Sequence, residues 1–137
     1  MKTLYTASAV ATGDGRNGHV QSFDGILDAD VRTPKELGGD GGATNPEQLF
    51  AAGYAACFHS ALKLVAGSMK VDTSDSEVVA DVSLLRAGAG FGLAVRLEVA
   101  IPAVSREVAL QVAQRAHEVC PYSNATRGNI EVVLEVA

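Results

Sequence analysis

Hydrophobic and polar residues alternate along several stretches of the chain, which is the pattern of strands that bury one face. The segments 25–31 (GILDADV) and 91–101 (FGLAVRLEVAI) both place apolar residues at every second position. The segment 129–136 (NIEVVLEV) alternates too, and 77–85 (EVVADVSLL) and 4–10 (LYTASAV) are further strand candidates. A short glycine-containing turn separates 77–85 from 91–101, so we predict that these two strands form an antiparallel hairpin.

A different pattern, small and apolar residues in an unbroken run, predicts a long helix from Pro46 to about Ala66. Asn45 suits the N-cap and a proline at the first helical position suits the first turn. In the middle of this helix only His59 and Ser60 are strongly polar. The helix is roughly 20 residues or ~30 Å long, and most of its circumference must be covered.

A second helix is predicted after Ser105, with an apolar stripe at Val108, Val112, Ala116 and Val119. It should end at Cys120, because a following proline disfavours the helical conformation there. The order of elements is strands, long helix, hairpin, helix and strand. We therefore expect an α+β fold with an antiparallel sheet packed on central helices, in one domain covering residues 1–137.

Composition and charge narrow the function classes. The chain has 47% hydrophobic and 20% charged residues, as globular proteins do. This composition also predicts no membrane as a partner. The net charge of the chain is -5 and its basic residues are scattered, so we expect no nucleic acid either. The first 15 residues are too polar for a secretory signal, which predicts a cytoplasmic protein. The glycine-rich segment 33–44 lacks the Gly-Lys-Ser/Thr ending of a phosphate-binding loop.

The chain has two cysteines, Cys57 in the middle of the long helix and Cys120 at the end of the second. They could serve packing, a structural bridge, a metal or redox chemistry. Cys57 lies beyond the first turn, where a helix dipole lowers a thiol pKa, and burial raises that pKa. A reactive Cys57 therefore needs a cation from elsewhere. His59 lies about 200° round the helix and points away from it.

We expect neither a metal nor a bound cofactor. Neither cysteine has a second cysteine or a histidine at a recurrent ligand spacing, and two sulfurs alone make a poor zinc site. In the cytosol thiols are kept reduced, so a pair that oxidises there is more often catalytic or sensing than structural.

Three motifs resemble those of the organic hydroperoxide resistance proteins, a branch of the family that includes the osmotically inducible protein C. They are TPKELGG at 33–39, TNPEQLFAAGYAACF at 44–58 and CPYSNATRGNIEV at 120–132. The likeness covers nearly the whole chain and includes GRNGHV at 15–20. The segment GGDGGA and the histidine after CF depart from the family pattern, but neither touches a residue with a chemical role.

The resemblance implies a role for each matching residue. Cys57 becomes the peroxidatic thiolate that attacks the hydroperoxide, and Cys120 the resolving thiol. Arg16 becomes the required cation and Glu47 its carboxylate partner. Since Glu47 is about 15 Å from Cys57 along the helix axis, it can act only through the arginine. We also expect aromatic residues near Cys57 to line an apolar substrate pocket, namely Phe50, Tyr54 and Phe58, and at least one of them to pack in the core instead.

The resemblance also implies the partners and the assembly. The substrate is an organic hydroperoxide, which is reduced to an alcohol, and the reductant is a dithiol such as a protein-bound dihydrolipoyl group (dihydrolipoamide). The fold is an intertwined homodimer in which antiparallel sheets with strands from both chains wrap the central helices. This OsmC-like arrangement fits a helix that is apolar on nearly every side.

Other functions remain open at this point. One is a non-enzymatic carrier of apolar ligands, and another is a thioesterase built round one long helix. A thioesterase needs a carboxylate or base beside the substrate carbonyl, and the helix offers only His59 near its middle. A third is an oxidation sensor that uses the same cysteines.

Overall fold

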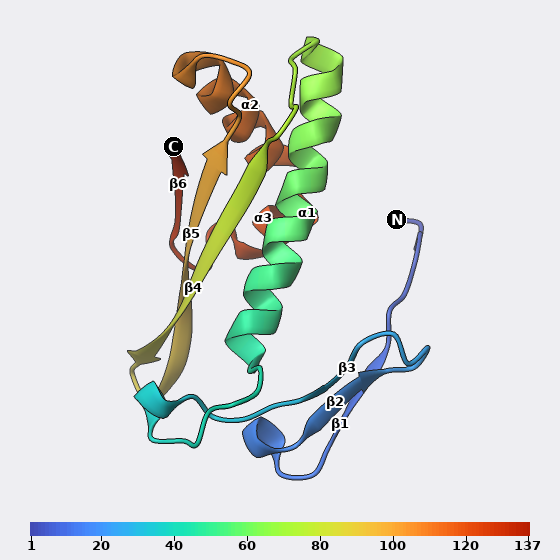
Figure 1. Ribbon diagram of the computed structural model, residues 1–137, viewed down its shortest axis with the longest axis vertical. Helices are drawn as coiled ribbons and strands as arrows, with labels where there is room; N and C mark the ends of the chain where they lie inside the picture. The colour runs from blue at the N-terminus through green and yellow to red at the C-terminus, as the bar shows by residue number, and fades with distance from the viewer. The chain divides into compact units, whose positions relative to one another are not determined.

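The computed structural model describes residues 1–137 (Figure 1). The chain divides into two compact units, Met1–Leu49 and Phe50–Ala137, which we describe separately. The single domain over 1–137 stays a prediction. The α+β class is confirmed, since helices and two separate sheets occur along one chain.

The N-terminal unit holds a three-stranded antiparallel sheet in the order β1-β2-β3. Its strands are β1 (Ala9–Thr12), β2 (His19–Ser22) and β3 (Asp28–Asp30). The predicted strand 4–10 therefore begins later than expected, and β2 was not predicted. Short 3-10 turns, η1 (Gly15–Asn17) and η2 (Lys35–Leu37), follow β1 and β3.

The long helix α1 (Pro46–Met69) begins where the sequence predicts. The Asn45 side chain accepts a hydrogen bond from the Gln48 backbone N–H at 2.9 Å, as an N-cap does. The helix passes the predicted end by almost one turn. It stops where Lys70 adopts a φ of 57°. By length and composition alone α1 could cross a bilayer, but core helices pass the same test, and one face of α1 is buried in this chain.

The C-terminal unit contains the sheet β4-β5-β6, with β4 (Glu77–Ala87), β5 (Gly90–Ala100) and β6 (Val132–Val136). The predicted antiparallel hairpin of β4 and β5 is confirmed. However, β6 pairs with β5 in parallel, not antiparallel as expected. Helical segments lie between β5 and β6 in the chain, and such a crossover returns the chain in the same direction.

Two helices lie between β5 and β6: α2 (Arg106–Val119) and the unpredicted α3 (Pro121–Thr126). Ser105 caps α2 by accepting a hydrogen bond from the Val108 backbone N–H at 3.2 Å. The buried face differs from the predicted stripe, since Val119 is 49% exposed. The buried residues of α2 are Ala109, Val112, Ala113 and Ala116. Alanines let this helix approach its neighbours closely.

The core of the C-terminal unit lies between the helices and one face of the sheet (Figure 1). Alternation along β5 places Val95, Leu97 and Val99 in this core, as predicted, while Arg96 lies on the opposite face. Residues of α1 cover the same face of the sheet, and Leu62 has no exposed surface. The core therefore fixes the middle of α1, where Cys57 lies, on a rigid support.

Candidate active site

The two cysteines meet in the C-terminal unit. Cys57 lies in the middle of α1, and Cys120 lies at the junction where α2 ends and α3 begins. Both are free thiols, and the Cys120 thiol donates a hydrogen bond to the Cys57 sulfur across 3.6 Å. Cys57 is partly exposed, whereas Cys120 is fully buried. Spacing in the sequence did not show this contact, because it depends on how α2 packs.

The surroundings of Cys57 oppose its ionisation. Burial raises its pKa most, and the neighbouring Cys120 sulfur raises it further. The Tyr122 backbone N–H acts in the other direction by stabilising the thiolate. No cation is among the groups of the C-terminal unit that shift the pKa of Cys57. A reactive thiolate at this position therefore needs a positive charge from elsewhere, as the sequence predicts.

Arg16 and Glu47 form a bidentate ion pair within the N-terminal unit. Arg16 Nη1 lies 2.7 Å from Glu47 Oε1, and Nη2 lies 2.9 Å from Oε2. The hydrogen bond to the carboxylate raises the pKa of Arg16, and the guanidinium lowers the pKa of Glu47. The first turn of α1 also favours the negative charge of Glu47. The structure thus joins two residues that the sequence paired only through the resemblance.

The three residues that follow Arg16 tie its turn to β3 and to the segment after it. The Asn17 side chain accepts a hydrogen bond from the Thr33 backbone N–H at 3.1 Å. The Gly18 carbonyl accepts one from Arg32 Nη1 at 2.9 Å. The His19 ring lies between two carboxylates, with Nδ1 2.8 Å from Asp30 and Nε2 2.5 Å from Asp28. Sequence reasoning missed this anchoring, although GRNGHV and the alternating aspartates contain its residues.

Aromatic rings contact one another near the part of α1 where the C-terminal unit begins. The ring centroids of Phe50 and Tyr54 are 6.2 Å apart, and those of Tyr54 and Tyr122 are 5.7 Å apart. Tyr54 and Phe58 have no exposed surface and belong to the core, whereas Phe50 is partly buried. Their role as pocket walls stays a prediction. Tyr122, which follows the Cys120-Pro motif, is an aromatic neighbour that the sequence analysis did not select.

Two further features bear on alternative chemistry. His59 Nε2 lies 3.0 Å from the Ser76 hydroxyl, so this histidine is engaged in a hydrogen bond. No group of three or more His, Cys, Asp or Glu side chains is placed to hold a metal ion.

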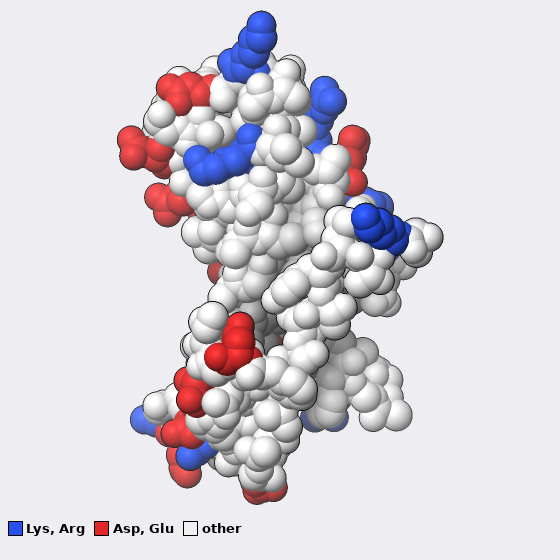
Figure 2. All heavy atoms as spheres, turned by 90° about the vertical axis from the view of Figure 1, so that its right-hand side faces the viewer, with Lys and Arg blue, Asp and Glu red and all other residues white.

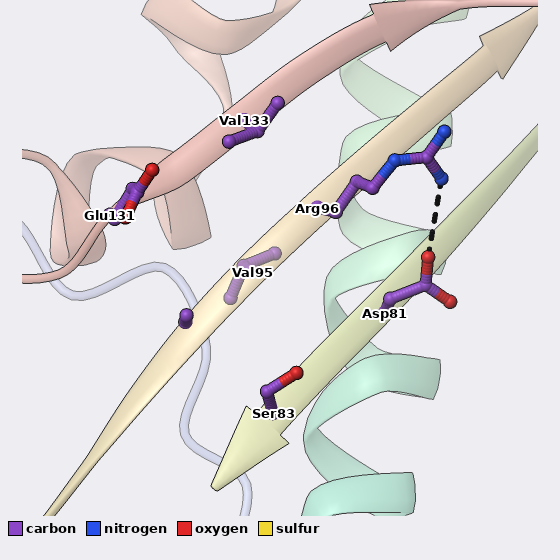
Figure 3. A pocket seen from close by; sticks show the side chains of 7 residues that line it. Asp81, Ser83, Val95, Arg96, Glu131 and Val133 are labelled. Atoms are coloured by element: carbon purple, nitrogen blue, oxygen red, sulfur yellow. Dashed lines mark hydrogen bonds and ion pairs between the residues drawn. The ribbon is translucent and has the colours of Figure 1, made fainter. Parts of the chain in front are cut away.

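A shallow hollow of about 250 Å³ on the sheet lies apart from the cysteines (Figure 3). It opens on the face opposite α1, and Arg96 lies along its wall. The guanidinium is held by three carboxylates, with contacts of 3.3 Å to Asp81, 3.1 Å to Glu98 and 2.5 Å to Glu135. On the face seen in Figure 2, basic and acidic side chains are intermixed, and the basic ones form no large patch.

Comparisons with known proteins agree with the motifs. The family profile described as "OsmC-like protein" matches residues 39–135. The organic hydroperoxide resistance protein of Xanthomonas axonopodis pv. citri is 51% identical over 138 residues, covering 99% of this chain and 96% of that protein. Organic hydroperoxide resistance protein OhrB of Bacillus subtilis is 47% identical over 135 residues, covering 97% of this chain and 98% of that protein.

Solved structures give the same result. The crystal structure of an organic hydroperoxide resistance protein from Elizabethkingia anophelis superposes with a TM-score of 0.93 at 56% identity, covering 100% of this chain and 99% of that chain. One from Legionella pneumophila also gives a TM-score of 0.93, at 52% identity and 99% coverage of both chains. The chain therefore belongs to the OsmC-like family, in the branch of the organic hydroperoxide resistance proteins.

Proposed function

We propose that the chain is a thiol-dependent peroxidase that reduces organic hydroperoxides to alcohols. The observation that carries this proposal is the contact between the two thiols, 3.6 Å apart, with one partly exposed and the other buried. Membership of the organic hydroperoxide resistance branch supports the substrate class. A buried second thiol is protected from solvent oxidants and is within reach of the first.

The reaction consists of two displacements. The Cys57 thiolate attacks one peroxide oxygen, the O–O bond breaks, and the organic alkoxide leaves and takes up a proton as the alcohol. Cys57 is thereby oxidised by two electrons to a sulfenic acid. The Cys120 thiol then displaces water from that sulfur and forms a disulfide. An external dithiol, such as protein-bound dihydrolipoamide, restores both thiols by two exchange reactions and is itself oxidised to a disulfide.

In this proposal Arg16 supplies the positive charge that Cys57 requires, and Glu47 acts indirectly by holding the guanidinium. A guanidinium stays protonated at any working pH and has five N–H donors. Two of them serve the carboxylate, at 2.7 and 2.9 Å. The remaining N–H donors are left to bind a thiolate and a peroxide oxygen. These contacts would lower the thiol pKa and stabilise the charge that develops on the leaving oxygen.

The proposed substrates are apolar, because the neighbours of Cys57 along α1 are aromatic or small. Each buried methylene group contributes about 0.8 kcal/mol. Three or four such groups of an alkyl hydroperoxide give roughly 100-fold tighter binding than a peroxide without them. Hydrogen peroxide gains nothing from apolar walls, and its second hydroxyl loses hydrogen bonds to water. Phe50, which keeps some exposed surface, is the proposed wall, and the fully buried Tyr54 and Phe58 are proposed to lie behind it.

We further propose that the protein works in the cytoplasm as an intertwined homodimer. Large apolar side chains of the N-terminal unit are exposed, with Leu4 at 90%, Phe23 at 78% and Ile26 at 86%. Large apolar side chains exposed to this extent support an interface. A second copy of the chain would bury it. Sedimentation at micromolar concentration should show a dimer, and a stable folded monomer would contradict this part of the proposal.

Competition kinetics test the proposed activity. Reduced protein with a small dithiol should consume tert-butyl or cumene hydroperoxide much faster than hydrogen peroxide. Cys57→Ser should abolish consumption, whereas Cys120→Ser should reduce one equivalent and accumulate a sulfenic acid on Cys57. Equal residual activity in both variants would overturn the assignment of roles. Turnover of no peroxide by the unmodified protein would leave an apolar-ligand carrier as the better explanation.

A further inference from the structure

A buried network of hydroxyl groups joins α1 to the segment that carries Cys120. The Tyr54 hydroxyl lies 2.8 Å from the Ser123 hydroxyl and 3.1 Å from the Thr126 hydroxyl. His117 Nδ1 lies 2.7 Å from the same serine oxygen. Tyr54 and Ser123 have no exposed surface, and Thr126 has 5%. Every buried side-chain polar atom has a hydrogen-bond partner, so the network is complete.

The Tyr54–Ser123 hydrogen bond joins the same two segments as the thiol contact, one helical turn away from it. Tyr54 precedes Cys57 by three positions on α1, and Ser123 follows Cys120 by three positions along α3. Residues three apart lie on one face of a helix. The Tyr54–Ser123 hydrogen bond and the Cys57–Cys120 contact are therefore two attachments between the same pair of segments. Two attachments fix both the sliding and the rotation of one segment on the other.

The hydrogen atoms of the network have one assignment that satisfies all four contacts. The Thr126 hydroxyl donates to the Ser123 carbonyl at 3.2 Å, so its oxygen is free to accept from Tyr54. The Ser123 hydroxyl must then donate to the Tyr54 oxygen, and His117 Nδ1–H must donate to the serine oxygen. All donors point in one direction along the chain of hydrogen bonds. A defect at any member leaves a buried partner unsatisfied.

We propose that Tyr54, Ser123 and Thr126, with His117, are positioning residues for the disulfide step, which hold the Cys120 thiol against Cys57. This inference deepens the proposed function and rests on it. The sulfur atoms are 3.6 Å apart in the reduced protein and must approach to about 2.05 Å when they bond. A network that keeps the α3 segment attached to α1 raises the effective concentration of one thiol at the other and so favours the disulfide.

The redox equilibrium with dithiothreitol tests this directly and needs no peroxide. In that exchange the two thiols lose two electrons and two protons to the oxidised form of dithiothreitol, which becomes the dithiol. We expect Ser123→Ala and Thr126→Val to lower the equilibrium constant for disulfide formation roughly tenfold each, the effect of losing one or two buried hydrogen bonds. Alkylation of the free thiols followed by mass spectrometry gives the constant at each dithiothreitol ratio.

Ser68→Ala is the matched control, because its hydroxyl donates to the Val65 carbonyl of α1 and takes no part in the network. Circular dichroism selects variants that remain folded, and Tyr54→Phe is a third variant that keeps the ring. An unchanged constant in the folded variants, or an equal change in Ser68→Ala, would overturn the inference. A shifted constant in a protein that consumes no peroxide would refute the proposed function and leave the positioning role standing.

A kinetic measurement separates positioning from general damage. In the Cys120→Ser background the oxidation of Cys57 by tert-butyl hydroperoxide should proceed at the same rate with and without Ser123→Ala. With Cys120 present, the sulfenic acid of Ser123→Ala should live roughly ten times longer than that of the unmodified protein. Equal sulfenic acid lifetimes would contradict the proposed role.

Discussion

The two units of the chain are stabilised by different interactions. The C-terminal unit has an apolar core in which Leu62, Leu97 and Val99 have no exposed surface. The N-terminal unit leaves Phe23 78% exposed and relies on hydrogen bonds and ion pairs such as Arg16–Glu47. The thiols therefore lie on a rigid apolar support, while the guanidinium lies on a polar segment with few buried contacts. Such segments open locally at lower free energy.

The largest effect should come from truncating the core of the C-terminal unit. Leu62→Ala should lower the free energy of unfolding by about 3–5 kcal/mol, because it leaves a cavity beneath the sheet. Phe23→Ala removes a larger side chain, but in an isolated chain it should change that free energy by less than about 0.5 kcal/mol, as exposed substitutions do. Urea denaturation followed by circular dichroism measures both.

The same pair of variants tests the assembly. If a second copy covers the N-terminal unit, the effect of Phe23→Ala should grow with protein concentration, since the folded dimer is favoured by mass action. The effect of Leu62→Ala should be large at every concentration. A large, concentration-independent loss in Phe23→Ala would mean that the N-terminal unit has a core of its own, and would break the comparison.

The next largest effect concerns the cation that we propose for Cys57. Arg16→Met should raise the apparent pKa of Cys57, because it removes the proposed cation. Glu47→Ala should raise it less, since the guanidinium remains and is only less firmly held. The pH profile of alkylation by iodoacetamide reports this pKa. Arg86→Met, which removes a guanidinium that lies over the Phe91 ring, is the control. Identical profiles for Arg16→Met and Arg86→Met would rule out the role of Arg16.

A smaller effect distinguishes two glycines of α1. A Cβ at Gly67 would meet no atom within 4 Å, so Gly67→Ala should stabilise the protein by about 0.5–1 kcal/mol through helix propensity. A Cβ at Gly53 would lie 3.0 Å from the Tyr122 hydroxyl. Gly53→Ala should therefore lose most of this gain by displacing the Tyr122 ring. Thermal denaturation compares the two variants. Equal stabilisation would show that the Tyr122 ring can move aside at no cost.

The smallest effect is a difference between two histidines. Hydrogen bonds to Asp30 and Asp28 raise the pKa of His19 in the N-terminal unit, whereas burial and the charge of Arg127 lower the pKa of His117. Below its ordinary pKa, His19 contributes its full stabilisation, which is lost as the pH rises through the raised value. His117 behaves oppositely and destabilises the fold as the pH falls. A proton NMR titration should show His19 titrating above His117, and the reverse order would contradict the contacts of both rings.

Much of the fold could be predicted from local patterns, since alternation identifies β5 and the cap at Asn45 identifies the start of α1. The parallel pairing of β6 could not, because strand direction depends on how α2 and α3 return the chain. The site shows the same division. Cys57 and Cys120 are visible as residues, but their contact depends on packing between distant segments. The His19 contacts depend on strand register, which periodicity alone does not set.

One titration tests the central claim, that Cys57 and Cys120 form a peroxide-reducing pair. One equivalent of tert-butyl hydroperoxide added to the fully reduced protein should oxidise both thiols of each chain. Mass spectrometry should show the loss of two hydrogen atoms and a peptide in which Cys57 and Cys120 are linked. A chain that keeps both thiols free, or one whose cysteines pair only with those of other chains, would contradict the account.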